Sequence, residues 1–217
     1  MRLLAIEGAL GAFECALLGE DLVLARRRVE SNQALEAGLS AIAETFDESG
    51  ISPDELDLIA VGLGPGGFTG LRVALSYAKA LAFAWKLPLL GISSFDTLEA
   101  GAQQLPRLCI VEGRPGIISA RLRTGDGERR ASGESAAAIA ELLPQPLAEP
   151  LALAGATAGA ARILAERGQP VFSLPQVPSP VLALARLACA MPAAAASPHA
   201  IVADYGEAPA AKVPTRT

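Results

Sequence analysis

Residues 62–70 form a glycine-rich segment with the spacing of a ligand-binding loop. The glycines follow the pattern GxGxxG after an apolar run and before a helix, which is the arrangement of a dinucleotide-binding fingerprint. Two features argue against a dinucleotide. Pro65 has no amide hydrogen to line a phosphate, and the next predicted strand, 88–92, ends without an acid for a ribose. The segment also contains no lysine, so it does not match a Walker loop.

The motif loop comprises Gly64, Pro65, Gly66, Gly67, Phe68, Thr69 and Gly70, with Arg72 in the first turns of the following helix. Its glycines permit positive φ and the close approach of another backbone. Thr69 is placed to cap the helix with its hydroxyl. Two interpretations stay open: a tight strand-to-helix turn, or a loop that docks a partner or holds an anion at a helix N-terminus.

Two short turns, 7–11 and 112–116, resemble the phosphate-binding hairpins of actin-like ATPases. In those hairpins an Asp manages a metal ion, and a Thr or Ser hydroxyl touches the phosphate. Here Glu7 and Glu112 replace the Asp, and neither turn has a hydroxyl before its second strand. The simplest interpretation is a fold that is retained while its catalysis is lost.

An internal repeat relates the two halves of the chain. Residues 2–18 align without a gap to residues 107–123. Identical residues stand at Arg2 and Arg107, Leu3 and Leu108, Glu7 and Glu112, Gly8 and Gly113, Gly11 and Gly116, and Leu17 and Leu122. The repeat predicts two related lobes, each built from a β-meander followed by helices.

The order of elements agrees with that repeat. Apolar runs separated by glycines at 2–6, 12–18 and 22–29 predict an antiparallel meander, and the apolar period then becomes helical over 31–49, which Ser31 can cap and Gly50 can end. Further strands are predicted at 58–61, 88–92 and 151–154, and helices at 69–85, 93–103, 136–143, 158–167 and 178–191. Residues 206–217 are expected to be a loosely held tail.

Helices 31–49 and 69–85 are the predicted contact surface for a partner. The first has one apolar stripe, and the second is apolar almost all round, so it must be buried on more than one side, in the fold or at a subunit interface. The candidate interface residues are Leu35, Leu39, Ile42, Phe46, Leu71, Leu75, Ala78 and Phe83. Leu39 has an open alternative as part of the chain's own core.

Composition narrows the function classes. The 217 residues are 51% hydrophobic and carry a formal net charge of -5, which supplies a core but no overall attraction to nucleic acid. Prolines interrupt the uncharged stretches and an acid stands at position 7, so we expect no membrane span, no signal peptide and a cytoplasmic location.

Three separated cysteines and a single histidine indicate reduced thiols and no metal site. His199 is interpreted as a surface residue, and 26–28, three arginines, as a solvated strand edge rather than an RNA site.

Three strings resemble one known family: VGLGPGGFTGLRV at 61–73, LLAIE at 3–7 and PLLGISS at 88–94. They are similar to the TsaB (YeaZ) family, the bacterial partner proteins in making threonylcarbamoyladenosine on tRNA. The second half matches loosely, with Glu112-Gly113-Arg114 where the family usually has Asp-Ala-Arg, and 205–212 as a degraded form of the family's ending. Gly67 stands where serine is common.

The resemblance implies an α/β, two-lobed actin-like (ASKHA, ribonuclease-H-like) fold with a mixed sheet in each lobe. Residues 1–103 are expected to form the first lobe with the partner-binding helices, and 104–217 a smaller, divergent second lobe. The implied role is a non-catalytic scaffold that pairs with TsaD and the ATPase TsaE to form N6-threonylcarbamoyladenosine at position 37 of tRNAs reading ANN codons.

The resemblance also implies a homodimer when the chain is alone, and tRNA contact only indirectly through the complex. It implies no metal and no tightly bound cofactor, with weak ATP or ADP binding at the complex interface. The alternatives are a small actin-like kinase or ATPase acting on a small molecule, which the short chain and missing catalytic acids disfavour, and a peptidase, for which no nucleophile arrangement is present.

Overall fold

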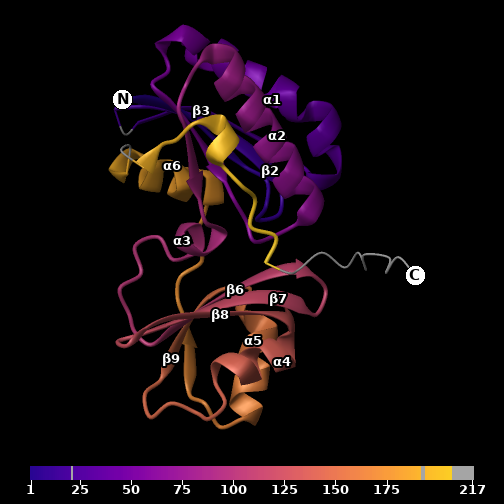
Figure 1. Ribbon diagram of the computed structural model, residues 1–217, viewed down its shortest axis with the longest axis vertical. Helices are drawn as coiled ribbons and strands as arrows, with labels where there is room; N and C mark the ends of the chain where they lie inside the picture. Colours follow the sequence, from indigo (N-terminus) through magenta and orange to yellow (C-terminus); the bar gives the residue numbers. More distant parts are fainter. Residues whose placement is uncertain (21, 192–193, 207–217) are drawn as a thin grey trace, which may run out of the picture.

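The structure is a computed structural model that describes residues 1–20, 22–191 and 194–206, and it has two lobes stacked along its long axis (Figure 1). In the first lobe β1 (Arg2–Glu7), β2 (Phe13–Gly19) and β3 (Leu22–Val29) form an antiparallel meander. Strands β4 (Leu58–Gly62) and β5 (Leu89–Ile92) extend the sheet in parallel beside β1. The sheet order is β3-β2-β1-β4-β5.

The second lobe repeats this arrangement. Its strands are β6 (Arg107–Arg114), β7 (Ile117–Thr124), β8 (Gly127–Glu134), β9 (Leu151–Gly155) and β10 (Val171–Ser173), in the order β10-β9-β6-β7-β8. The expected two-lobed fold with a mixed sheet in each lobe is therefore confirmed. The sequence did not reveal β8 and β10, because β8 is a mostly exposed edge strand in which only Ala131 is buried.

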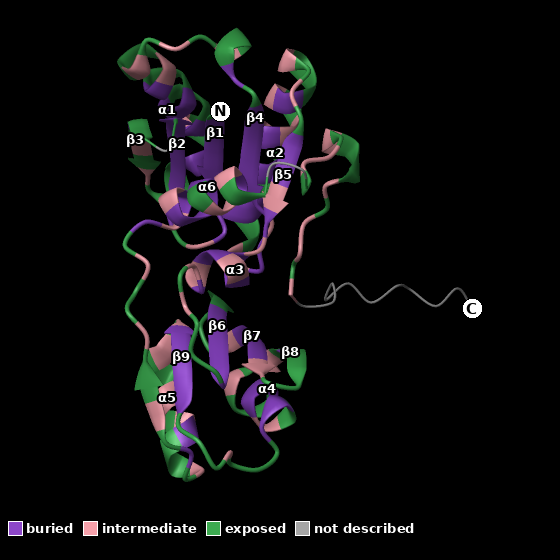
Figure 2. Ribbon diagram, turned by 90° about the vertical axis from the view of Figure 1, so that its left-hand side faces the viewer, coloured by how far each residue is buried: buried purple, intermediate pink, exposed green. Residues whose placement is uncertain are grey.

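Helices cover the first sheet on both faces. Helices α1 (Ala34–Ser49) and α2 (Phe68–Trp85) pack on one face, and α6 (Pro180–Ala190) packs on the other. Along β1 the apolar residues divide accordingly, with Leu4 and Ile6 toward α1 and α2, and Leu3 and Ala5 toward α6. Figure 2 shows the inner strands of both sheets buried, whereas the edge strands β3 and β8 are largely exposed.

The second sheet has a different cover. Helices α4 (Ser135–Leu142) and α5 (Thr157–Glu166) pack on one face. The short helix α3 (Ser94–Leu98), which leads out of the first lobe, packs on the other face of β6 through Phe95 and Cys109. Figure 1 shows α3 between the two sheets, so it belongs to the junction of the lobes.

The predicted lobe boundary at 103/104 holds only for the start of the second lobe. Helix α6, which the sequence assigned to the second lobe, returns to the first sheet, and Ala196 forms a bridge with Leu89 of β5. The reason is that the first sheet has a second apolar face, which is buried only when another layer covers it. Of the predicted loose tail, only Gly206 belongs to the described residues.

The helix ends predicted from local sequence were partly correct. Gly50 ends α1 with φ of 68°, and the Ser93 hydroxyl caps α3 by accepting from the Phe95 amide at 3.2 Å. Ser31 instead opens a 3-10 turn before α1, and Thr69 lies inside α2, which starts at Phe68 without a side-chain cap. Helix α3 ends at Leu98, before the predicted residue 103. Among the described residues, no helix is long and apolar enough to cross a bilayer.

Candidate functional site

The motif loop packs directly on the first hairpin, between β1 and β2. The Gly67 amide donates to the Ala9 carbonyl oxygen at 2.8 Å. A Cβ added to Gly66 would lie 2.2 Å from that oxygen, and one added to Gly70 would lie 2.1 Å from the Gly8 oxygen. The glycines are therefore required by backbone-to-backbone packing, which supports the interpretation as a tight strand-to-helix turn.

Glu7 is buried at the base of the same hairpin, with 1% of its surface exposed. Its Oε1 accepts hydrogen bonds from the amides of Ala9 at 2.6 Å and Leu10 at 3.1 Å. Its Oε2 is buried, has no hydrogen-bond partner within the described part of the chain, and lies 2.1 Å from the position of a Cβ on Gly62. Burial raises the pKa of this carboxyl to about 7. Two amides of the hairpin thus serve its own acid rather than a bound anion.

The second hairpin, between β6 and β7, also holds its own acid. The exposed Glu112 accepts from the Gly116 amide at 3.0 Å. Gly113 lies against the motif loop, since a Cβ on it would be 3.4 Å from the Gly66 oxygen. The motif loop therefore lies between the two hairpins that resemble phosphate-binding turns.

The end of the described chain fixes the motif loop from its other side. The Asp204 amide donates to the Leu63 oxygen at 2.7 Å. A Cβ on Gly64 would lie 2.3 Å from the Asp204 oxygen, and one on Gly206 would lie 2.1 Å from the Ser119 hydroxyl of β7. Residues 204–206 thus connect the first lobe to the second across the motif loop.

The predicted partner interface is only partly on the surface. Leu35, Leu39 and Phe83 are 66%, 50% and 69% exposed, so the alternative that Leu39 belongs to the core is wrong. Ile42, Leu71, Leu75 and Ala78 are buried in the chain's own core and cannot touch a partner, and Phe46 is half-buried against Trp85. The buried residues lie on the helix faces that pack on the sheet. The apolar pattern of the sequence does not distinguish a face that packs on the sheet from one that is exposed to a partner.

Helices α1 and α2 lie side by side, and a group of apolar residues is exposed next to the line of contact between them. The Tyr77 hydroxyl of α2 donates to the Leu35 oxygen at 2.8 Å, and Phe46 packs edge-on against Trp85 with centroids 5.6 Å apart. We call the exposed residues beside this seam the α1–α2 face: Leu35, Leu39, Ala43, Ala80 and Ala84. The alanines of this face were not among the interface residues predicted from the sequence. The available signal was their spacing: Ala43 follows Leu39 by four residues and Ala84 follows Ala80 by four, which places each pair on one side of its helix.

Among the described residues, no three His, Cys, Asp or Glu side chains are grouped as metal ligands would be. His199 lies on the surface as predicted, with its ring 6.1 Å from that of Phe83. The arginines at 26–28 lie on the sheet edge, where Arg27 pairs with Glu44 and Glu48 on α1. The surface position of His199 and the edge position of the three arginines agree with the sequence-based interpretation.

Two five-stranded sheets of the same order, with the motif loop between their first hairpins, define a two-lobed protein of the actin-like class. Its fold is that of YeaZ from Pseudomonas aeruginosa, with a TM-score of 0.69, 23% identity, and coverage of 94% of this chain and 99% of that chain. The activator of 2-hydroxyisocaproyl-CoA dehydratase from Clostridium difficile, with bound ADPNP, matches with a TM-score of 0.50 and 10% identity over 87% of this chain and 94% of that one.

The sequence comparisons give the family. The protein-family model described as "TsaD: tRNA N6-adenosine threonylcarbamoyltransferase" matches residues 28–212 of this chain. The TsaB proteins of Escherichia coli K12 and Bacillus subtilis 168 are 33% identical over 102 residues and 32% identical over 110 residues. These matches cover 47% and 50% of this chain and 44% and 48% of the relatives, so the chain spans about half the length of the curated relatives it matches. The chain belongs to this family, in its TsaB (YeaZ) branch.

Proposed function

We propose that the chain is a non-catalytic partner subunit in tRNA threonylcarbamoyladenosine biosynthesis. It pairs with a TsaD-type transferase and with TsaE in the cytoplasm, and the complex forms N6-threonylcarbamoyladenosine at position 37 of tRNAs reading ANN codons. The proposal rests on the names of the TsaB relatives and on one structural observation, the exposed apolar α1–α2 face.

The composition of the α1–α2 face suits helix-to-helix docking. Leu35 and Leu39 project from α1, while Ala80 and Ala84 leave the surface of α2 low enough for another helix to approach closely. Such a face can pair with a second copy across a two-fold axis or with the related transferase. The homodimer of the isolated chain and its complex with TsaD are therefore proposed to use the same face.

The hairpins support a role without catalysis. In an actin-like kinase or ATPase, the alternative function, the acid of the first hairpin faces the ligand, whereas Glu7 is buried and bonded to the hairpin's own amides. In this proposal the chain holds no cofactor tightly, and weak ATP or ADP binding belongs to the interface of the assembled complex.

The test is Leu39→Asp, with the affinity for the transferase of the same organism measured by calorimetry. A buried carboxylate in the interface should weaken pairing at least about tenfold, the equivalent of ~1.4 kcal/mol. Leu105→Asp is the matched control, because Leu105 is 50% exposed, as Leu39 is, and lies between α3 and β6, outside the α1–α2 face. Equal affinity of both variants and the wild type would refute the assigned face.

In cells, deletion of the gene followed by mass spectrometry of tRNA nucleosides tests the pathway itself. Threonylcarbamoyladenosine should disappear and return when the wild-type chain is restored. Unchanged levels in a strain without a duplicate gene would contradict the proposed function.

A further inference from the structure

A stripe of aromatic and basic side chains follows the flank of α2 that lies away from α1. We call it the α2 stripe: Phe68, Arg72, Lys79 and Phe83 of α2, Lys86 at its C-cap, and Tyr205 and His199 from the C-terminal segment. The spacings of four, seven, four and three residues keep the α2 members on one side of the helix. Helix packing alone does not explain this pattern, since Phe68 and Phe83 are 58% and 69% exposed.

The stripe is a basic region on an acidic chain. Helix α2 contains no Asp or Glu, whereas the whole chain has a formal net charge of -5. Within residues 1–20, 22–191 and 194–206, Arg72, Lys79 and Lys86 form no ion pair, and Arg72 instead stacks over the Phe68 ring at 5.1 Å. Cations left without acids on a helix surface favour an anionic ligand.

The exposed aromatic rings of the stripe indicate that the anionic ligand also carries flat rings that can stack. At one end Phe68 lies 5.4 Å from Tyr205, with the rings inclined by 38°, and at the other end Phe83 lies 6.1 Å from His199. The rise of 1.5 Å per residue places Phe68 and Phe83 about 22 Å apart along the helix. Exposed rings next to cations are the platforms on which unpaired bases stack while their phosphates are neutralised.

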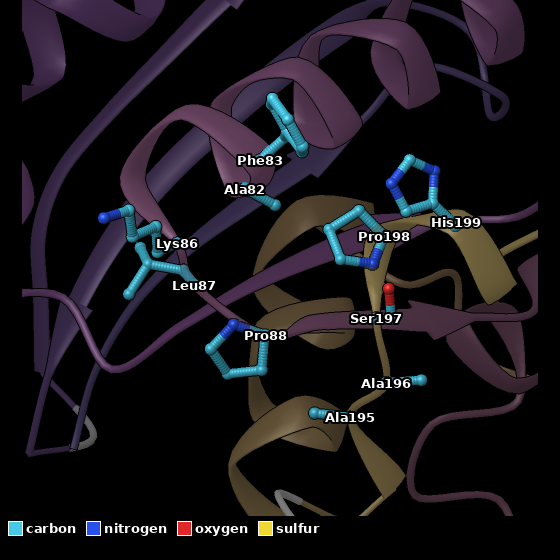
Figure 3. Close-up of a pocket in the computed structure, with 10 residues that line it drawn as sticks. All are labelled: Ala82, Phe83, Lys86, Leu87, Pro88, Ala195, Ala196, Ser197, Pro198 and His199. Carbon is cyan, nitrogen blue, oxygen red and sulfur yellow. The ribbon is translucent and has the colours of Figure 1, made fainter.

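A groove lies beside the ring pair of Phe83 and His199 (Figure 3). It is a shallow, open groove with a volume of about 550 Å³. Phe83 and His199 lie at one end and Lys86 at the other, and the floor is apolar, with Leu87, Pro88, Ala195 and Ala196. Such a groove can accept a flat apolar ring at Phe83 and leave the attached phosphate near a lysine.

We propose that the α2 stripe binds a single-stranded segment of RNA, with unpaired bases stacked on the two aromatic platforms and one base in the groove. This inference rests on the proposed function and extends it, because the chain then contacts the tRNA substrate directly rather than only through its partners. It also reassigns Phe83 from the protein interface to the RNA. The α1–α2 face remains available to the transferase, since its α2 members, Ala80 and Ala84, lie between the stripe and the side of α2 that contacts α1.

The experiment measures binding of a fluorescein-labelled, unmodified tRNA that reads an ANN codon, by anisotropy over a range of salt concentrations, with the full chain in its reconstituted complex with the transferase. Phe83→Ala and Phe68→Ala should each weaken binding about tenfold, the equivalent of one lost stack. Phe172→Ala is the matched control, because Phe172 is 44% exposed on β10 of the other lobe.

The salt dependence tests the cations separately. Arg72→Ala and Lys79→Ala should each lower the slope of log affinity against log salt by about 0.7, the value for one phosphate contact on a single strand. Arg186→Ala, at an exposed position of α6 on the opposite face of the sheet, should leave the slope unchanged.

Each outcome has a defined meaning. Loss of RNA affinity in the stripe variants, with pairing to the transferase intact, supports the proposal. Unchanged RNA affinity in these variants overturns it. Weakened pairing without a change in RNA affinity also overturns it, because the stripe is then a protein surface. Leu39→Asp separates the two proposals, since it should weaken pairing at least about tenfold while the chain without the transferase, measured by the same anisotropy assay, keeps its RNA affinity.

Discussion

The two lobes have the same strand order but differ by one residue in their first hairpins. Leu4 and Ile6 of β1 face α1 and α2, and their counterparts toward α4 and α5 are Leu108 and Ile110 of β6. The gapless alignment of the sequence pairs Leu108 with Leu3, which faces α6. A slip of one residue reverses the faces of a strand, so the predicted repeat is correct in architecture and wrong by one residue in this strand.

The difference of one residue between the two hairpins changes which side chain stands at the end of the first strand. The irregular register between Glu112 and Arg114 accommodates the additional residue in the second hairpin. Val111, not Glu112, is therefore the structural counterpart of Glu7, and it is buried with 3% of its surface exposed. One lobe has a buried acid where the other has a valine.

The remaining face of each sheet also differs. Apolar residues of α6 cover the first sheet, whereas α3 covers the second with Phe95 and with ion pairs. Glu99 lies 2.7 Å from Arg107 and 3.1 Å from Arg121, and all three side chains are at most 5% exposed. One topology can therefore be closed by an apolar layer or by a buried ionic cluster.

The largest effect is expected when a charge enters the apolar core of the first lobe. Ala78 is completely buried against the sheet, so Ala78→Arg should destabilise the fold by about 5 kcal/mol or more, comparable to the stability of a whole domain. Ala80→Arg, on the exposed side of the same helix, should fold normally. Thermal unfolding followed by Trp85 fluorescence, which reports on the first lobe, distinguishes them, and a folded Ala78→Arg would disprove the core assignment.

The next largest effect concerns the ionic cover of the second lobe. Glu99→Ala should lower the free energy of unfolding by about 3–5 kcal/mol, because it leaves the buried Arg107 and Arg121 without their shared acid. Glu128→Ala removes a carboxylate that is 33% exposed and should cost about 1 kcal/mol or less. Urea unfolding monitored by circular dichroism measures both, and equal losses would contradict the distinction between buried and exposed pairs.

The buried acid of the first hairpin predicts a pH dependence. The pKa of Glu7 is raised from 4.5 to about 7, so the folded state holds a proton that the unfolded state has lost between these values. Stability should therefore fall as pH rises from 4.5 to 7, by about 3 kcal/mol at most, and then remain level. The decline should vanish in Glu7→Gln and persist in Glu112→Gln, in which Glu7 is intact. A decline that survives Glu7→Gln would assign it to other groups.

The smallest effect separates two glycines of the motif loop. Gly70→Ala places a methyl group 2.1 Å from the Gly8 oxygen and should cost about 1–3 kcal/mol. Gly67→Ala meets only the Ala9 oxygen at 3.7 Å and should change stability by less than about 0.5 kcal/mol. Chemical unfolding of both variants checks this difference, and a reversed order would refute the described packing on the first hairpin.

Much of the fold was predictable from local patterns. The meander at 2–29, the helices at 31–49 and 69–85 and the repeat in the second half follow from apolar periodicity and glycine turns, which depend on neighbours in the chain. Strand β8 was missed because an edge strand needs few apolar residues. The site was less predictable: the α1–α2 face is formed by Leu35 and Leu39 together with alanines that the pattern does not distinguish from core residues.

The sequence by itself determined the class of protein, because the order of its elements, the glycine-rich motif loop and its repeat are properties of the chain. Only the tertiary structure decided which lobe α6 covers, which side of α2 is exposed, and that Glu7 is buried while Glu112 is not. The physical reason is that burial depends on contacts between segments far apart in the chain. A shift of one residue in a strand register reverses those contacts while leaving the local pattern almost unchanged.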